Sequence, residues 1–225
     1  CSRLWKKGKG RSWKDFGDGA VRIYFDTSIA NDAYILTKIY SGEKFSKHYK
    51  KDLQYWKKEY VALYFLLDLD NEWELEFVTS PIMREEIKKY KNSHKFNLEL
   101  YSYLLNFYYM LMEKVEFIPF NIGKESIKEI KHIGLKERDS RHICHARKLK
   151  CDFFITTDKN TIIKYKDKLE KFGIKVRLPS EFIEENFIEL STLIRALYGS
   201  WNSSEEVFDL ISKDIINYST LSSLK

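Results

Sequence analysis

The sequence predicts an α/β fold of three layers, in which helices cover both faces of a central and mostly parallel sheet. From residue 21 onward, short runs rich in β-branched and aromatic residues alternate with longer runs of helical period. This alternation is typical of βαβ units, whose strands are parallel and whose helices lie against the sheet. The composition agrees, because 44% of the 225 residues are hydrophobic and only 3 are proline, as in a globular domain with one core.

Five runs have the composition of short buried strands. They lie at residues 21–25, 74–79, 115–119, 152–156 and 174–178. The first run stops abruptly at Asp26-Thr27-Ser28. A carboxylate therefore follows directly on the end of the first predicted strand.

The runs between the strands have apolar residues at helical spacing, and several carry signals for a helix end. Helices are expected at residues 29–40, about 50–68, 81–90, about 95–114, 123–131, 136–150 and 160–172, and most of 181–225 is helical in pattern. Ser80 followed by Pro81 supplies an N-cap and a proline in the first helical position. Gly173 is placed to end the helix over 160–172.

Pattern and charge divide the chain into three parts. We expect residues 1–20 to form a flexible basic N-terminal arm, residues 21–185 the α/β domain, and residues 186–225 a C-terminal helical extension. The net charge is +6, but residues 1–22 alone hold seven basic and two acidic side chains. The body is therefore close to neutral, and its charge alone does not predict a nucleic-acid groove.

No feature of the sequence indicates a membrane or an oxidising compartment. No run is long and apolar enough to cross a bilayer, and the start of the chain lacks the pattern of a secretory signal. The cysteines Cys1, Cys144 and Cys151 are too few and too unevenly spaced for a disulfide framework. We therefore expect a cytoplasmic protein with no membrane partner.

Four acidic residues fall where a doubly wound fold gathers its ligands. Asp26 ends the first strand, Asp158 follows the fourth, and Glu86 lies in the first turns of the helix after the second. Asp139 lies early in the helix that leads into the fourth strand. Ligands of an open parallel sheet bind beyond the carboxyl ends of its strands. Four carboxylates meeting there would repel one another without cations, and such hard oxygen ligands select Mg²⁺ or Mn²⁺ over zinc.

A structural role is the alternative for each acidic residue taken alone. Carboxylates are common at helix N-termini, where they cap the helix and complement its dipole. By that rule Asp26 or Asp158 alone is more often a cap or turn residue, and only the ordered set of four favours a metal site. Glu85 stays open as the rival of Glu86, because sequence does not fix the register of one helical turn.

The same residues belong to a pattern that resembles the PIN domain. This is the fold of many toxin ribonucleases in prokaryotic toxin–antitoxin pairs and of several RNA-processing nucleases. The resembling segments are Ile23 to Ser28, Ser80 to Ile87, Asp139 to Leu149, Cys151 to Asp158 and Val176 to Phe182. Each segment is weakly specific by itself, whereas the ordered set over about residues 21 to 185 is more specific.

The resemblance implies a role for particular residues. The metal ligands and catalytic residues would be Asp26, Glu86, Asp139 and Asp158, with Mg²⁺ or Mn²⁺ as the cofactor. The side chains expected to orient these carboxylates or bound water are Thr27, Ser28, Thr157 and Asn160.

The function implied by the resemblance is a metal-dependent endoribonuclease, in which a metal-activated water attacks an RNA phosphodiester. It leaves open a role as a toxin with an antitoxin protein as partner, and a homodimer.

The alternative is a PIN fold that binds RNA or protein without catalysis, although a pure binding module has no use for four acidic residues. A third reading is an unrelated doubly wound domain of the receiver or hydrolase type. The sequence contains neither a glycine-rich phosphate loop nor a Gly-x-Ser-x-Gly elbow, so nothing supports this third interpretation.

A group of His and Cys residues near Asp139 invites a zinc interpretation. His142, Cys144, His145 and Cys151 fall within ten residues, but one helix cannot present all four tetrahedrally. We expect both cysteines to be small buried hydrophobic residues. His142 lies one turn after Asp139, so it could face the carboxylates.

Two basic segments have two interpretations each. The helix over 136–150 and the Lys- and aromatic-rich stretch over 41–60 could contact RNA phosphates or simply present a solvated face.

Overall fold

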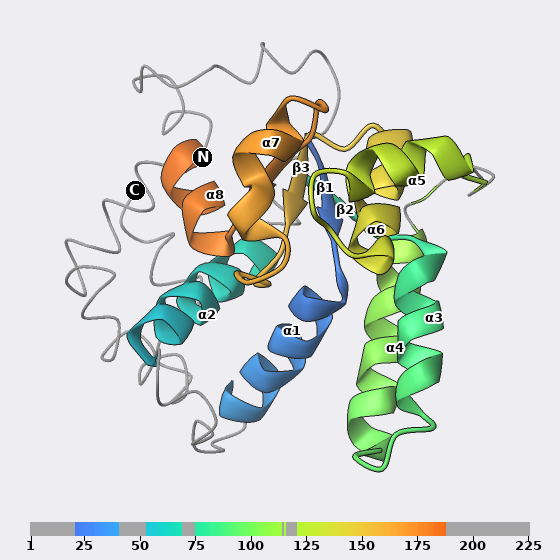
Figure 1. Cartoon of the computed structure of the whole chain (residues 1–225). Coiled ribbons are helices and arrows are strands. Elements are labelled where there is room, and N and C mark those ends of the chain that lie inside the picture. The colour runs from blue at the N-terminus through green and yellow to red at the C-terminus, as the bar shows by residue number, and fades with distance from the viewer. Residues whose placement is uncertain (1–20, 41–52, 69–74, 114, 116–120, 188–225) are drawn as a thin grey trace. The chain divides into compact units, whose positions relative to one another are not determined.

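The computed structural model describes residues 21–40, 53–68, 75–113, 115 and 121–187 (Figure 1). The chain divides into two compact units. The sheet unit comprises Arg11–Asn31 and Leu69–Leu178, and the helical unit comprises Cys1–Gly10, Asp32–Asp68 and Pro179–Lys225. The expected arm over 1–20 and all but the first two residues of the expected extension over 186–225 lie outside the described residues. In the described part of the chain no helix has the length and apolarity that a membrane crossing requires.

The described residues form four strands and eight α-helices. In chain order these are β1 Val21–Phe25, α1 Thr27–Tyr40, α2 Leu53–Asp68, β2 Leu75–Val78, α3 Pro81–Tyr90, α4 Leu98–Glu113, α5 Lys124–Lys131, α6 Glu137–Lys148, β3 Phe153–Ile155, the 3₁₀ turn η4 Ile163–Tyr165, α7 Lys166–Glu170, β4 Lys175–Arg177 and α8 Pro179–Asn186. The α/β class and the parallel sheet are thereby confirmed.

All pairings in the sheet are parallel, in the order β2-β1-β3-β4. Val78 of β2 and Phe154 of β3 are both register partners of Tyr24 in β1. The chain leaves β1 toward one edge of the sheet to form β2, and later forms β3 and β4 on the other side. Beyond the carboxyl ends of β1 and β3 lies the switch point where doubly wound folds bind ligands.

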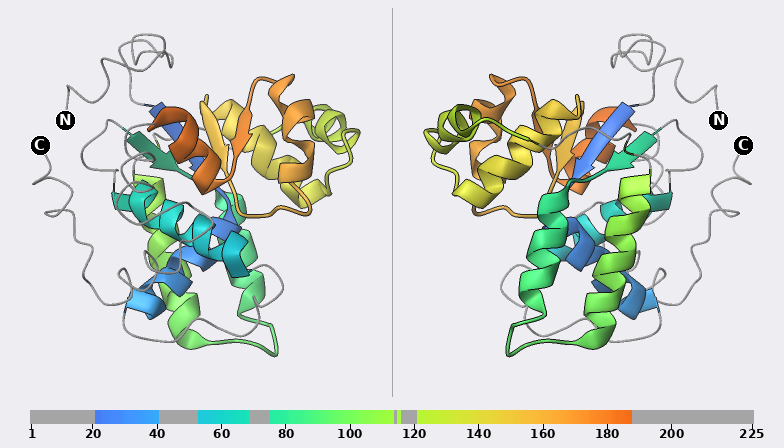
Figure 2. Two further views of the ribbon diagram at one scale, coloured as in Figure 1. Left: turned by 90° about the vertical axis from the view of Figure 1, so that its left-hand side faces the viewer. Right: turned by 90° about the vertical axis from the view of Figure 1, so that its right-hand side faces the viewer.

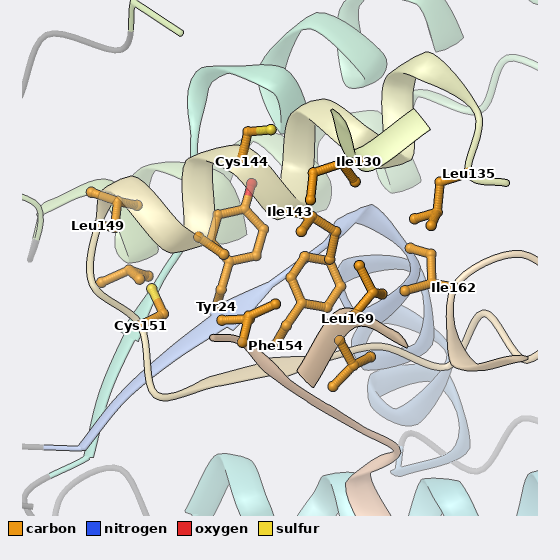
Figure 3. Packing of buried hydrophobic residues seen from close by; sticks show 14 residues of the cluster. Tyr24, Ile130, Leu135, Ile143, Cys144, Leu149, Cys151, Phe154, Ile162 and Leu169 are labelled. Carbon is orange, nitrogen blue, oxygen red and sulfur yellow. The ribbon is translucent and has the colours of Figure 1, made fainter. Parts of the chain in front are cut away.

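Helices α5, α6 and α7 cover one face of this sheet. The buried cluster on that face joins Tyr24, Phe154 and Val176 of the strands to apolar side chains of the helices, including Ile130 and Ile143. Figure 3 shows the rings of Tyr24 and Phe154 next to each other on this face, and their centroids are 5.1 Å apart. Burial of these side chains holds α6 against β1, which fixes where Asp139 and His142 lie.

Helix α4 lies against the opposite face. Phe25, the next residue after Tyr24 in β1, points the other way and stacks on Phe107 of α4 with ring centroids 6.5 Å apart. Phe77 of β2 packs against the same ring of Phe25, with centroids 4.7 Å apart. The alternation of β1 between the two faces is what a strand with helices on both sides requires.

The helical unit contains α2, the last part of α1, and α8. Glu59 of α2 is buried and accepts hydrogen bonds from the backbone N–H of Ser180, 3.0 Å, and from the Ser180 hydroxyl, 2.7 Å. A carboxylate of α2 therefore caps the N-terminus of α8. The hydroxyl of Tyr60 donates to Asp32 within the same unit, at 3.1 Å.

Several predicted boundaries differ from the structure. The helix over 160–172 is wrong in extent, because turns come first and only η4 and the short α7 are helical. The cause is local: Thr161 bonds back to Asp158, and side chains that bond nearby backbone compete with a helix. Helix α4 begins at Leu98, three residues later than predicted. The predicted strand over 115–119 lies outside the described residues except for Val115, which forms a bend.

Candidate metal and phosphodiester site

The first acidic residue, Asp26, follows β1 directly and begins α1. Its Oδ1 accepts hydrogen bonds from the backbone N–H groups of Ser28, 3.1 Å, and Ile29, 3.3 Å, and from the Ser28 hydroxyl, 2.5 Å. Asp26 is therefore the N-cap of α1. Its Oδ2 accepts from the hydroxyl of Thr156 at 2.6 Å. Burial raises the pKa of Asp26 above the ordinary aspartate value, although the hydrogen bonds from Ser28 and Thr156 act in the opposite direction.

Thr156 joins Asp26 to Asp158. Its hydroxyl donates to Asp26 and accepts from the backbone N–H of Asp158 at 3.0 Å. Both carboxylate oxygens of Asp158 also bond to Thr161, Oδ1 to the backbone N–H at 3.0 Å and Oδ2 to the hydroxyl at 2.5 Å. Asp26, directly after β1, and Asp158, three residues after the end of β3, are thus linked through the side chain of Thr156.

The four residues expected to orient the carboxylates differ in their hydrogen-bond partners. Thr27 and Ser28 both bond to carboxylates, of Glu86 and Asp26 respectively. The threonine whose hydroxyl contacts Asp26 is Thr156, one residue before the expected Thr157, whose backbone N–H instead donates to Ser28 Oγ at 3.2 Å. Asn160 is exposed and makes no hydrogen bond to the described residues, and Thr161 holds Asp158 in its place.

Glu86 and its neighbour Glu85 have different partners in the structure. Glu86 lies among the site residues, where Thr27 donates to its Oε2 and the Nε of Arg138 lies 2.9 Å from its Oε1. Glu85 points to another side of α3 and pairs with both terminal nitrogens of Arg141, at 3.0 and 3.2 Å. Burial raises the pKa of Glu86, but the imidazole of His142, the Thr27 hydroxyl and Arg138 outweigh it, so the pKa is lowered overall.

Asp139 is buried on the first turn of α6. Its pKa is raised, first by burial and then by the charges of Asp158 and Glu86, while Arg138 opposes the shift. The Nε of Arg138 lies 3.8 Å from Asp139 Oδ1. The Nε of Arg138 therefore approaches the carboxylates of both Glu86 and Asp139.

A buried polar chain that the sequence did not identify supports Glu86. The hydroxyl of Tyr24 lies 2.6 Å from Ser80 Oγ and 2.7 Å from Nδ1 of His142. The Nε2 of His142 lies 3.5 Å from Glu86 Oε1, too poorly aligned for a hydrogen bond. His142 thus lies next to a carboxylate, as its spacing from Asp139 indicates. The signals in the sequence were the i, i+3 spacing of His142 from Asp139 and a tyrosine two residues before Asp26.

The two cysteines near these hydrogen-bonded side chains are core residues, as expected. Cys144 and Cys151 are buried, unpaired and part of the apolar cluster under α6 (Figure 3). Burial raises the pKa of the Cys144 thiol to about 11, so it stays protonated at neutral pH. A neutral thiol is a poor zinc ligand.

Four carboxylates, one arginine and one histidine thus gather beyond the carboxyl ends of β1 and β3. Four ionised carboxylates and one guanidinium sum to three negative charges in excess. Oxygen donors with excess negative charge suit Mg²⁺ or Mn²⁺. Over the described ranges, no three His, Cys, Asp or Glu side chains are close enough together to ligate one ion. Mg²⁺ commonly binds one or two carboxylates and keeps several waters, so such a trio is not a requirement for it.

Comparison with known proteins adds no further constraint. No family model matches the chain, and neither does any curated protein or solved structure.

Proposed function

We propose that this chain is a ribonuclease of the PIN type, dependent on Mg²⁺ or Mn²⁺. The proposed architecture is the three-layer α/β/α arrangement of that family, with the site at the carboxyl ends of the central strands. The observation that carries the proposal is the contact pattern of the acidic residues: Thr156 links Asp26 to Asp158, and Nε of Arg138 lies 2.9 Å from Glu86 and 3.8 Å from the buried Asp139.

Buried carboxylates without a matching cation destabilise a fold, so their presence calls for a reason. Arg138 balances one of the four charges. A divalent ion would offset more of the excess and reverse the upward pKa shifts of Asp26 and Asp139. The ligands proposed are Asp26, Glu86, Asp139 and Asp158, with each bound ion taking one or two of these carboxylates and completing its coordination with water.

The chemistry that such an ion supplies is the activation of water near neutral pH and the stabilisation of charge on a phosphate. The residues of the chain orient the carboxylates. Thr27 donates a hydrogen bond to Glu86, Arg138 pairs with it, and Nε2 of His142 lies 3.5 Å from it. Thr156 links the carboxylate of Asp26 to the backbone N–H of Asp158.

A second candidate function has its own observation. The carboxylates of Asp26 and Asp158 are used as a helix cap and a turn cap, as acidic residues at these positions often are. If capping were their whole role, the fold would be a PIN-like module that binds RNA or protein without catalysis. Asp139 speaks against this, because it accepts no hydrogen bond from the described residues that would explain its burial.

The experiment is therefore built on Asp139. In Asp139→Asn the charge is lost while shape and volume are kept, and no hydrogen bond of the described residues depends on that charge. We expect the purified variant to lose cleavage of single-stranded RNA in Mg²⁺ or Mn²⁺, and the wild type to lose it in EDTA. The matched control is Glu85→Gln, which removes one acidic charge from the neighbouring helix but leaves the site intact. RNA cleavage by Asp139→Asn at the wild-type rate would refute the proposal.

The toxin role is a separate proposal, with an antitoxin protein as the partner. It predicts that expression of the wild type arrests growth of a bacterial host and that Asp139→Asn does not. Growth arrest by both proteins alike would remove the catalytic toxin interpretation.

A further inference from the structure

The connection between α3 and α4 carries an unbalanced positive charge. Between Glu86 and Glu99 the chain has no acidic residue. The same interval contains four lysines, Lys88, Lys89, Lys91 and Lys95. All four are exposed, and none forms an ion pair with a described residue. We call residues 88–98 the α3–α4 tip.

The acidic residues of α3 do not neutralise this charge. Glu85 pairs with Arg141 and Glu86 with Arg138, so both are engaged by α6. The remaining cation of α3, Arg84, lies over the ring of Tyr109 in α4, 5.7 Å from its centroid. The α3–α4 tip is therefore a local concentration of cations in a chain whose body is nearly neutral.

An aromatic platform lies among these lysines. Phe96 is 40% exposed although it is a large apolar residue, and Leu98 beside it is 71% exposed. The ring of Phe96 stands between those of Tyr90 and Tyr101, at centroid distances of 6.0 and 5.6 Å. Exposed rings among cations are the surface on which single-stranded nucleic acids stack their bases and place their phosphates.

Hydrogen bonds hold the α3–α4 tip in a defined shape. The hydroxyl of Tyr90 donates to the carbonyl of Lys95 at 2.7 Å and accepts from the backbone N–H of Asn97 at 3.0 Å. The side chain of Asn97 in turn accepts from the backbone N–H of Leu100 at 3.1 Å, which caps α4. A surface already ordered before binding loses less conformational entropy when a ligand arrives. Figure 2 shows α3 and α4 running side by side away from the sheet, with the tip at their far end.

We propose that the α3–α4 tip binds single-stranded RNA, with the lysines on phosphates and Phe96 under a base. The choice of RNA over DNA rests on the proposed function. Helix α3 carries Glu86 in its middle and the tip at its end, so Glu86 and Lys91 are separated by about 8 Å of helix rise. A strand held at the tip can therefore continue toward the carboxylates.

The test measures binding without cleavage. A fluorescein-labelled 12-nucleotide single-stranded RNA is titrated with protein in EDTA, and its anisotropy is followed at several salt concentrations. The triple variant Lys88→Gln, Lys91→Gln, Lys95→Gln should bind about tenfold more weakly. Its log–log salt slope should be shallower by about 2, because each contact to single-stranded phosphate contributes about 0.7. The matched control changes three exposed lysines elsewhere, Lys124→Gln, Lys128→Gln and Lys171→Gln, and should bind as the wild type does.

The stacking contact has its own pair of variants. Phe96→Ala should weaken binding about 5- to 160-fold, whereas Phe96→Tyr should bind as the wild type does, since a phenol also presents an aromatic face. An unchanged unfolding midpoint in both variants shows that the tip stays folded. Equal binding by the tip triple and the control triple, or no effect of Phe96→Ala, overturns the proposal. So does competition by polyglutamate at the same charge concentration, which would indicate an acidic protein as the ligand.

The same experiments separate this inference from the proposed nuclease. RNA bound through the tip without any cleavage in Mg²⁺ supports the tip and refutes the nuclease. Cleavage that is normal in the lysine triple, with normal binding, refutes the tip and leaves the nuclease standing. Equal affinity for DNA of the same sequence overturns the choice of RNA.

Discussion

Removal of the Tyr24 hydroxyl tests the buried hydrogen bonds that join Ser80, Tyr24 and His142 next to Glu86. In Tyr24→Phe, Ser80 Oγ and Nδ1 of His142 both lose a partner, from 2.6 and 2.7 Å, and all three side chains are at most 3% exposed. Burial raises the pKa of Tyr24 far above the ordinary tyrosine value, so the group lost is a neutral phenol. A buried polar group left without its partner costs about 1–3 kcal/mol. Two such groups make the expected loss of unfolding free energy about 2–6 kcal/mol.

The assay is urea unfolding followed by circular dichroism, with Tyr90→Phe as the matched control. Tyr90 also makes two hydrogen bonds, but they lie at the exposed α3–α4 tip, where water can replace the phenol. We expect the control to lose less than about 1 kcal/mol. Equal losses of unfolding free energy in the two variants, or a Tyr24→Phe protein within about 0.5 kcal/mol of the wild type, would refute this role of the Tyr24 hydrogen bonds.

Three further predictions concern stability. Burial raises the pKa of Glu59 to about 7, so the unfolded chain loses this proton before the folded one does. The wild type should then lose about 2–3 kcal/mol between pH 5 and pH 8 relative to Glu59→Gln in urea unfolding; parallel pH profiles would contradict it. Lys150 has φ of 55° after the end of α6, so Lys150→Gly should raise the unfolding free energy by about 1 kcal/mol, and a lower melting temperature would be inconsistent with that strain. Gly134 has φ of 113° and an added Cβ would lie 2.6 Å from the Tyr165 hydroxyl, so Gly134→Ala should destabilise by roughly 1–3 kcal/mol, whereas a neutral effect would mean that the loop adapts freely.

Features written in local sequence were predictable. The alternation of strand and helix gave the parallel sheet, because each element buries a face whose period is visible in the residues. The start of α3 at Pro81 was also predicted, since proline fits only the first turn. The hydroxyl of Ser80, however, makes no cap bond there and contacts Tyr24, a residue 56 positions earlier. Such a partner depends on tertiary packing and leaves no local signal.

The choice between adjacent residues was the other limit. Glu85 and Glu86 are equally plausible in sequence, and only the packing of α3 against α6 decides which one meets Thr27 and which one meets Arg141. Likewise the hydroxyl on Asp26 comes from Thr156 and not from the predicted Thr157, because neighbouring residues at a strand end point in different directions. A shift of one residue changes which side chains surround a site without changing the fold.

The dependence of the site on a divalent cation is best tested by thermal unfolding in increasing MgCl₂, at constant ionic strength. A ligand at 100 times its Kd stabilises by about 2.7 kcal/mol, which for a chain of this size corresponds to a rise in Tm of roughly 5–10 °C. The account predicts this rise for the wild type and for Glu85→Gln, and little or none for Asp139→Asn. In EDTA, Asp139→Asn should be at least as stable as the wild type, because a repelling charge has been removed. A wild-type Tm that does not respond to Mg²⁺ or Mn²⁺ would contradict the account.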